Sequence, residues 1–236
     1  MDVDFDVRSD AGGRDPDVHS PTLRPYHQLL WSKPLPSGHH FSLSTDTPGT
    51  YLHHRSAVGE FWLSSDAISH SLSSITRMRS VLASVPLGAL ESFYTLNCTI
   101  GSYLVFPGNT INRKPTVNGA RGMHPRIRDR FDLTLECIRR FSVDEANPLG
   151  EVLHRYSDYF SLFEDFETYV EFFLLQDLVD DHGSVRFHLP FEGFDQSPLP
   201  ATTAHYLEYR SASMTFVAAR NRRIRSWTEA HLRCGI

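Results

Sequence analysis

The sequence has few cysteines, no long apolar run and no recognisable export signal. Its 236 residues include three cysteines, Cys98, Cys137 and Cys234, which form no CxxC pair. This spacing argues against a disulfide framework or a zinc ribbon and is typical of a reducing cytosol. No apolar run approaches the roughly 18–20 residues that cross a bilayer, and the acidic start MDVDFDVRSD is unlike a signal peptide. We therefore expect a cytoplasmic protein with no membrane partner.

The common catalytic motifs are missing as well. The sequence contains no G-x-x-x-x-G-K-[ST], no G-x-G-x-x-G after a strand, no H-E-x-x-H and no G-x-S-x-G. Ordinary ATPases, dinucleotide enzymes, zinc proteases and α/β-hydrolases are therefore not expected. The pairs His39-His40 and His53-His54 are adjacent, and neighbours on a strand point to opposite faces, so we predict no metal site. The sequence leaves open which cofactor, if any, is bound and whether the protein is an enzyme.

The composition is that of a globular protein whose charges are arranged in blocks. Hydrophobic residues make up 40% and aromatic residues 12%, which is ample for a core. The net charge is −5, but residues 103–140 carry eight Lys/Arg and three Asp/Glu, whereas residues 141–198 carry two and thirteen. One interpretation is an acidic surface and one or two basic surfaces. The other is that the blocks face each other or solvent.

The spacing of apolar residues predicts one α+β domain over residues 1–236, with four or five helices on a small antiparallel or mixed sheet. Residues 1–40 are expected to form an extended arm, which aromatic residues dock onto the domain. Strands are expected in residues 41–63, around a TPG turn, and at 98–106 and 185–189. The last helix is predicted at 203–233, with Thr202 or Thr203 as its cap.

Five further helices or helical segments follow from the same patterns. They are expected from Ser64 or Ser65 to Pro86, at 87–94, from Pro125 onward, after Asn147-Pro148, and at 166–179. The segment 166–179 is apolar nearly all round, so it should lie at the centre of the core with Phe173 almost fully buried. We expect Asp177 to pair with an arginine of residues 113–140, because a buried carboxylate needs a partner.

The glycine- and arginine-rich loop that follows residues 103–106 is the main candidate binding site. Backbone N–H groups at a helix N-terminus, glycines that let a ligand approach, and nearby cations together favour a phosphate or carboxylate. The expected ligand-binding residues are Asn109, Arg113, Lys114, Asn118, Gly119, Arg121, Gly122 and Arg126. The alternative is a long β-hairpin with solvated arginines.

Three residues are candidates for catalysis. His27 beside Tyr26 is a candidate for acid–base chemistry, and Asp129 and Asp132 could act as bases if the loop folds over them. The basic end of the last helix, ARNRRIRSWTEAH, could contact a nucleic-acid backbone with Trp227 among its arginines.

Several long blocks of the chain resemble one family. The blocks SDAGGRDPD, SPTLRPYHQLLWSKPLP, FPGNTINRKPTVNGARG and RFDLTLECIRR are similar to an uncharacterised bacterial family built on a domain of unknown function. The resemblance covers nearly the whole chain. It implies one continuous domain in a bacterial cytoplasm and brings no activity or catalytic residues with it.

The sequence therefore suggests two alternative functions. The first is binding, and in an enzyme also processing, of a phosphate-bearing ligand, nucleotide or nucleic acid at the central loop, roofed by the N-terminal arm. It predicts that Arg121→Ala weakens binding and leaves the melting temperature nearly unchanged. The second is a non-catalytic interaction module or homo-oligomer that uses the acidic and basic faces.

Overall fold

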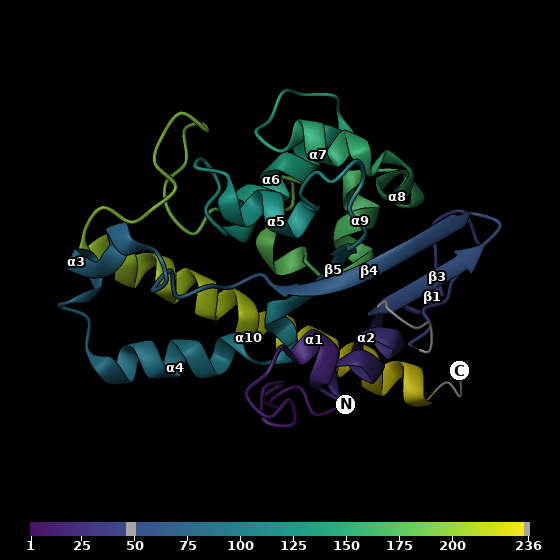
Figure 1. The fold of residues 1–236 in the computed structure, drawn as a ribbon, viewed down its shortest axis with the longest axis horizontal. Helices are drawn as coiled ribbons and strands as arrows, with labels where there is room; N and C mark the ends of the chain where they lie inside the picture. The colour runs from purple at the N-terminus through teal and green to yellow at the C-terminus, as the bar shows by residue number, and fades with distance from the viewer. Residues whose placement is uncertain (46–50, 234–236) are drawn as a thin grey trace.

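The structure, a computed structural model, describes residues 1–45 and 51–233. Within these residues there are ten α-helices and two small antiparallel sheets, so the α+β class is confirmed and the predicted count of four or five helices is too low. Figure 1 shows three layers: one group of helices above the larger sheet, the sheet itself, and the N-terminal helices with the long last helix below it. The TPG turn and Cys234 lie outside the described residues, and the single-domain boundary stays a prediction.

The larger sheet has strand order β3-β4-β5 and is built on β4. The strands are β3 (Leu52–Ser56), β4 (Gly59–Ala67) and β5 (Tyr103–Pro107), and β5 is buried along its whole length. The helix expected from Ser64 or Ser65 is wrong, because that stretch continues β4: Ser65 pairs with Val105 and Ala67 with Tyr103. The cross-strand hydrogen bonds override the helical spacing of the apolar residues that follow.

The first 40 residues are more structured than the extended arm that the sequence suggests. They contain α1 (Pro16–His19), α2 (Leu23–Trp31) and a two-stranded ribbon of β1 (Lys33–Pro34) with β2 (His40–Phe41). Buried apolar side chains at Val3, Val7, Leu30 and Trp31 anchor this arm in the core. The expected docking through aromatic residues is correct for Trp31.

Above the sheet lies a group of short helices. They are α5 (Val117–Met123), α6 (Phe131–Ser142), α7 (Gly150–Arg155), α8 (Ser157–Phe160) and α9 (Phe166–Phe172). Pro125 does not open a helix as predicted: it lies in a turn, and α6 begins six residues later. Arg128 and Asp129 have left-handed backbone, with φ of 49° and 61°, and this interrupts the chain between the turn at Pro125 and the start of α6.

The helix predicted at 166–179 is divided. It ends at Phe172, Leu174 takes φ of 55°, and a 3₁₀ turn follows at Gln176–Leu178. The predicted position of this segment in the core is confirmed, because Phe173 is 1% exposed and the Phe173 ring contacts the rings of Phe163 and Tyr169. The predicted strand at 185–189 is reduced to one bridge, between Val179 and Val185.

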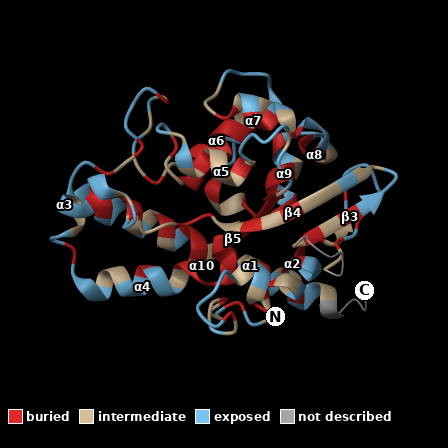
Figure 2. Cartoon of the chain, in the orientation of Figure 1, coloured by how far each residue is buried: buried red, intermediate tan, exposed pale blue. Residues whose placement is uncertain are grey.

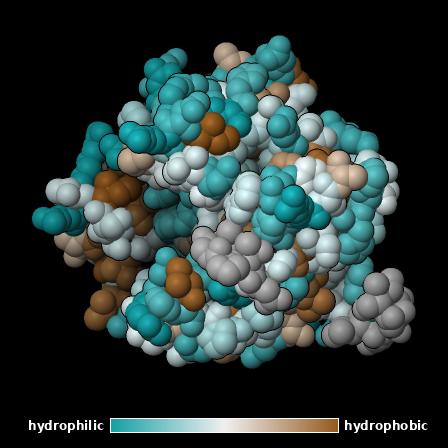
Figure 3. All heavy atoms as spheres, turned by 45° about the vertical axis from the view of Figure 1, so that its right-hand side comes forward, coloured by the Kyte–Doolittle hydropathy of each residue, from teal (hydrophilic) through white to brown (hydrophobic). Residues whose placement is uncertain are grey.

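The remaining helices form the lower layer and a side extension. They are α3 (Arg79–Leu82), α4 (Leu87–Asn97) and α10 (Thr203–Arg233), the last with Thr202 at its start as predicted. A second, smaller core joins α4 to α10 through Phe93 and Tyr209. Figure 2 shows the most deeply buried segments where the helices meet the sheet, and Figure 3 shows hydrophobic residues gathered on the side where α3 and α4 lie. No helix in the described part of the chain is long and apolar enough to cross a membrane.

Candidate functional site

The cations of the predicted central-loop site are mostly paired with carboxylates of the chain itself. Lys114 contacts Glu151 at 2.5 Å, and Arg126 contacts Asp195 at 3.4 Å. Arg113 is exposed and adopts a left-handed backbone with φ of 58°. This pairing reduces the net positive charge that the loop offers to an anion.

The other residues of that prediction are divided between the loop and a helix. Asn109 is exposed, and its carbonyl accepts a hydrogen bond from Tyr156. Asn118, Gly119 and Gly122 lie within α5, where Thr116 caps the helix. Neither the expected long hairpin nor a glycine loop ahead of a helix is formed, because α5 occupies the segment.

The structure does bring Arg121 together with Asp129. Arg121 is completely buried, and its Nη1 lies 2.7 Å from Asp66 Oδ2 and 3.7 Å from Asp129 Oδ1. Its guanidinium also donates to the carbonyl of Ala67 and, at 3.5 Å, to the hydroxyl of Thr134. We refer to Asp66, Arg121 and Asp129 as the Arg121 cluster. Its arginine ties helix α5 to strand β4 and is covered on all sides.

Two of the catalytic candidates are enclosed in the protein interior. Burial lowers the pKa of His27 to about 3, so the ring is neutral, and its Nδ1 accepts a 2.9 Å hydrogen bond from Trp31. Asp132 is also fully buried and accepts both the guanidinium of Arg130 and the backbone N–H of His188. Burial raises the pKa of Asp132, but Arg130 and His188 outweigh it and hold the pKa at about 2. A carboxylate so acidic and so fully bonded is a poor general base.

Three carboxylates of these segments pair with arginines. Asp132 pairs with Arg130, and Glu136 pairs with Arg140 at 2.7 Å. Asp177 pairs with Arg223 of α10 and not with residues 113–140, so that prediction is wrong. Helix α10 runs beside the 3₁₀ turn and thus brings an arginine distant in sequence to Asp177.

An open cleft lies on the N-terminal side of the Arg121 cluster. This arm cleft measures about 580 Å³ and is lined by parts of residues 6–16, 67–71 and 94–98 and by Tyr103. Its floor is polar: Ser69 donates a 2.6 Å hydrogen bond to Asn97 and contacts Ser213 of α10. The arm, the end of β4 and α4 therefore meet at one opening.

The arm supplies the charged wall of this cleft. The Arg8 guanidinium donates two hydrogen bonds, of 3.0 and 2.7 Å, to the Asp6 carboxylate and lies over the ring of Tyr94. Arg14 is exposed, and its Nε contacts only the Ala11 carbonyl, at 3.4 Å. Among the described residues no carboxylate forms an ion pair with Arg14. It is thus the uncompensated cation of the cleft.

Two consecutive glycines precede Arg14. Gly12 and Gly13 have φ of 63° and 75°, a conformation that residues with a Cβ rarely adopt. A Cβ added at either glycine would meet no atom within 4 Å, so the requirement is conformational and the space beside the backbone is open. A ligand can therefore approach the peptide groups of this turn closely.

His70 connects the arm cleft to the Arg121 cluster. Its Nε2 lies 2.7 Å from the carbonyl of Ala67, which can only accept, so Nε2 carries the proton and Nδ1 holds a lone pair. Burial, followed by Arg121, lowers the pKa of His70, while Asp129 and Asp66 oppose this. The imidazole is consequently neutral near pH 7 and can accept a proton at Nδ1.

Asp17 lies behind the same wall of the cleft. One of its carboxylate oxygens accepts the backbone N–H of Ser65 at 2.9 Å, and the other accepts the Ser65 hydroxyl. Burial raises the pKa of Asp17 to about 7. In this way α1 is attached directly to β4 by an acid that changes its charge near neutral pH.

Two features of the sequence mark this site. The block DAGGRDPD carries Gly12, Gly13 and Arg14 but also has the composition of a solvated turn. Asp66 and His70 lie in the stretch predicted to be helical after Ser64 or Ser65, whereas β4 ends between them. Within the described residues no group of three or more His, Cys, Asp or Glu side chains is placed to hold a metal ion.

A family model, the family of unknown function DUF6994, matches residues 1–224. The chain belongs to DUF6994. No curated protein and no solved structure matches it. The family match therefore confirms the resemblance seen in the sequence blocks, and it assigns no activity to this DUF6994 chain. The arm cleft, the Arg121 cluster, His70 and Asp17 all lie within the matched region.

Proposed function

We propose that the arm cleft binds a small phosphate-bearing molecule of about nucleotide size. The observation that carries this proposal is Arg14, an exposed arginine in the cleft wall that has no carboxylate partner among the described residues. A guanidinium with free donors beside open glycine backbone is well suited to phosphate oxygens. The volume of about 580 Å³ lies within the usual range for small-ligand sites.

The charge of the cleft also favours an anion. Its charged lining residues are Asp6, Arg8 and Arg14, since His70 is neutral near pH 7. Arg8 is neutralised by Asp6, which leaves one net positive charge on Arg14. The phosphate ligand expected from the sequence is thus better supported here than at the central loop, where the cations are paired.

His70 gives the same site a group for proton transfer. Its Nδ1 carries the lone pair, and its Nε2–H is fixed by the carbonyl of Ala67. A neutral imidazole next to a bound ligand can remove a proton from a water molecule or a hydroxyl group. If the protein processes its ligand, His70 is the residue that acts as general base. A cytoplasmic location belongs to the same proposal, because Cys98 and Cys137 are buried free thiols.

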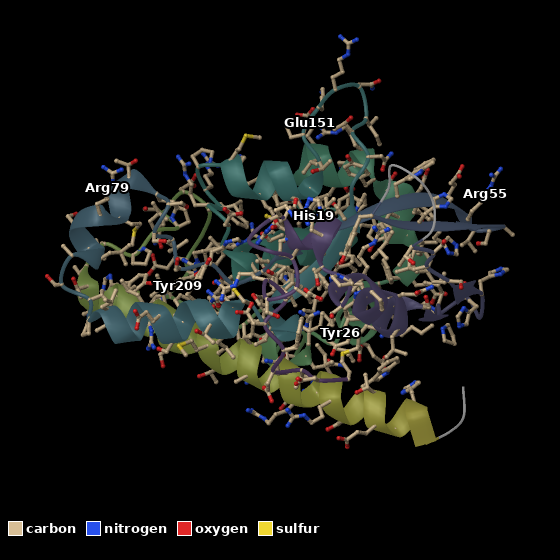
Figure 4. The ribbon with its side chains drawn as sticks, turned by 60° about the horizontal axis from the view of Figure 1, so that its bottom comes forward. His19, Tyr26, Arg55, Arg79, Glu151 and Tyr209 are labelled. Atoms are coloured by element: carbon tan, nitrogen blue, oxygen red, sulfur yellow. The ribbon has the colours of Figure 1, made fainter. Side chains whose placement is uncertain are left out.

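Calorimetric titration of the full chain with ADP, pyrophosphate and adenosine tests the proposal. We expect the two phosphate compounds to bind and adenosine to bind more weakly. Arg14→Ala should lower the affinity for pyrophosphate roughly 10- to 100-fold, because a charged hydrogen bond contributes about 1.5–3 kcal/mol. The matched control is Arg79→Ala on α3, an exposed arginine far from the cleft (Figure 4), which should bind as the wild type does.

Two outcomes would overturn this proposal. One is that none of the phosphate compounds binds the wild type; the other is that Arg14→Ala and Arg79→Ala bind equally well. Light scattering on the same samples tests the alternative, an interaction module or homo-oligomer. That alternative would be favoured if the protein forms a concentration-dependent oligomer and binds none of the three ligands. Leu87 on α4 is exposed and is the natural contact for such an oligomer.

A further inference from the structure

Lysine is scarce in this chain and its two copies have opposite surroundings. Only Lys33 and Lys114 occur among 23 basic residues. Lys114 is exposed and paired with Glu151. Lys33, on β1, is partly buried and lines a second cleft. Nearly all basic residues of the chain are arginines, and Lys33 is the lysine that lies in a partly enclosed site.

Three aromatic rings surround the amine of Lys33. Its Nζ lies 5.3 Å from the ring centre of Trp31, 4.5 Å from that of Phe172 and 5.1 Å from that of Trp227. The amine also donates a hydrogen bond to the carbonyl of Phe172. These rings come from α2, α9 and α10, so the tertiary fold assembles the cage from three distant segments.

The charges near this amine favour its neutral form. Burial, followed by Arg220, lowers the pKa of Lys33 to about 7, and Glu171 opposes the shift. Arg220 is fully buried and donates to the carbonyls of Gly101, Tyr103 and Phe173 without a carboxylate partner among the described residues. An unneutralised guanidinium so close disfavours a second positive charge.

The surrounding cleft has the space and the polar groups for a ligand. This lysine cleft measures about 620 Å³ and is lined on one side by Leu35, Phe172 and Trp227. The Oε1 atom of Gln176, also in the lining, is buried and has no hydrogen-bond partner. A buried acceptor without a donor is costly, so it favours a ligand that carries a hydroxyl or amine group.

We propose that Lys33 is an imine-forming amine that captures an aromatic aldehyde in the lysine cleft. The neutral amine attacks the carbonyl carbon and forms a C–N bond, which gives a carbinolamine. Its hydroxyl then takes a proton and leaves as water, and a protonated imine remains. No oxidant or reductant is involved. Solvent water supplies that proton, because the cleft is open.

The cage explains why an aromatic aldehyde is preferred. The protonated imine is a cation enclosed by three π faces, which attract positive charge. Its N–H can keep the hydrogen bond to the carbonyl of Phe172. An aryl group attached to the imine carbon would extend the stacking with Trp227 and Phe172, whereas a short aliphatic aldehyde would not.

Reductive trapping tests this inference independently of the arm cleft. The full chain is incubated at pH 7 with benzaldehyde or acetaldehyde and cyanoborohydride, and the adducts are located by peptide mass spectrometry. Lys33 should react with benzaldehyde at least roughly tenfold faster than Lys114, because an ordinary lysine is almost wholly protonated at pH 7. Lys114 serves as the internal control, and Lys33→Arg should remove the rapid adduct.

Trp227→Leu separates recognition from the reactivity of the amine. This variant keeps Lys33 and removes one ring of the cage, so the preference for benzaldehyde over acetaldehyde should fall several-fold while the melting curve shows that the chain is folded. Equal labelling of Lys33 and Lys114 at pH 7 would overturn the inference. So would an equal rate with the two aldehydes in the wild type.

Discussion

The guanidinium of Arg121 donates a 2.7 Å hydrogen bond from Nη1 to Oδ2 of Asp66, and this contact joins α5 to β4 inside the protein. Arg121 is completely buried, whereas the Asp66 side chain retains 32% of its exposure. The arginine that the sequence placed in a ligand pocket therefore has a structural position. We therefore expect its removal to affect folding before it affects the binding of any ligand.

We expect Arg121→Ala to lower the free energy of unfolding by about 3 kcal/mol. The substitution leaves Asp66 and Asp129 without their shared cation, and breaking a buried pair costs about 3–5 kcal/mol, reduced here because Asp66 is partly exposed. Urea denaturation measures the change. Arg113→Ala, at an exposed arginine, is the control and should stay within about 0.5 kcal/mol. An unchanged urea midpoint for Arg121→Ala would instead agree with the expectation from the sequence that Arg121 binds a ligand and contributes little to stability.

Phe173→Ala should cost about 3–5 kcal/mol, because it opens a cavity among aromatic rings. Phe173 is 1% exposed, and its ring centre lies 4.9 Å from that of Phe172 and 5.2 Å from that of Trp31. The melting temperature and the urea midpoint should both fall strongly. Leu87→Ala removes a side chain that is 70% exposed and should change little. Similar losses in the two variants would contradict the central position of Phe173.

Asp17 should make stability depend on pH between about 4 and 7. Burial raises its pKa from 3.8 to about 7, so the folded state binds a proton more tightly than the unfolded state. The stabilisation by that proton is complete below about pH 4 and is lost as the pH rises through 7. Its size is on the order of 1–4 kcal/mol. Asp17→Asn keeps the shape of the side chain and removes the titration.

The measurement for Asp17 is the difference in urea midpoint between wild type and Asp17→Asn from pH 4 to pH 8. We expect the variant to gain stability relative to the wild type as the pH rises, because it never buries a charge. Other titrating groups are common to both proteins and cancel in the difference. Parallel pH profiles would show that Asp17 titrates normally.

Local sequence patterns correctly predicted the features that depend on one short segment of the chain. The cap at Thr202 or Thr203 predicted the start of α10, and Phe173 proved to be buried, as its apolar neighbours in the sequence indicated. The family resemblance was correct too, since the model of DUF6994 matches residues 1–224. The start of α10 and the apolar neighbours of Phe173 are set within a few positions along the chain, which is information that the sequence carries directly.

Pairing between distant segments had to come from the folded chain. Residues 64–67 were expected to begin a helix, but they join β4 because β5 supplies pairing partners about 40 positions further on. Asp177 needed a cation, and only the course of α10 makes that cation Arg223. The cage around Lys33 likewise takes its rings from α2, α9 and α10.

The physical reason for this division is the range of the interactions. Helix spacing, caps and turn glycines act within about four residues, so the order of amino acids is enough to reveal them. Burial, ion pairing and the pKa of a side chain depend on which groups surround it in space. Asp17, His70 and Lys33 are ordinary residues in the sequence; packing against β4, the Arg121 cluster and Arg220 changes their charge behaviour near neutral pH.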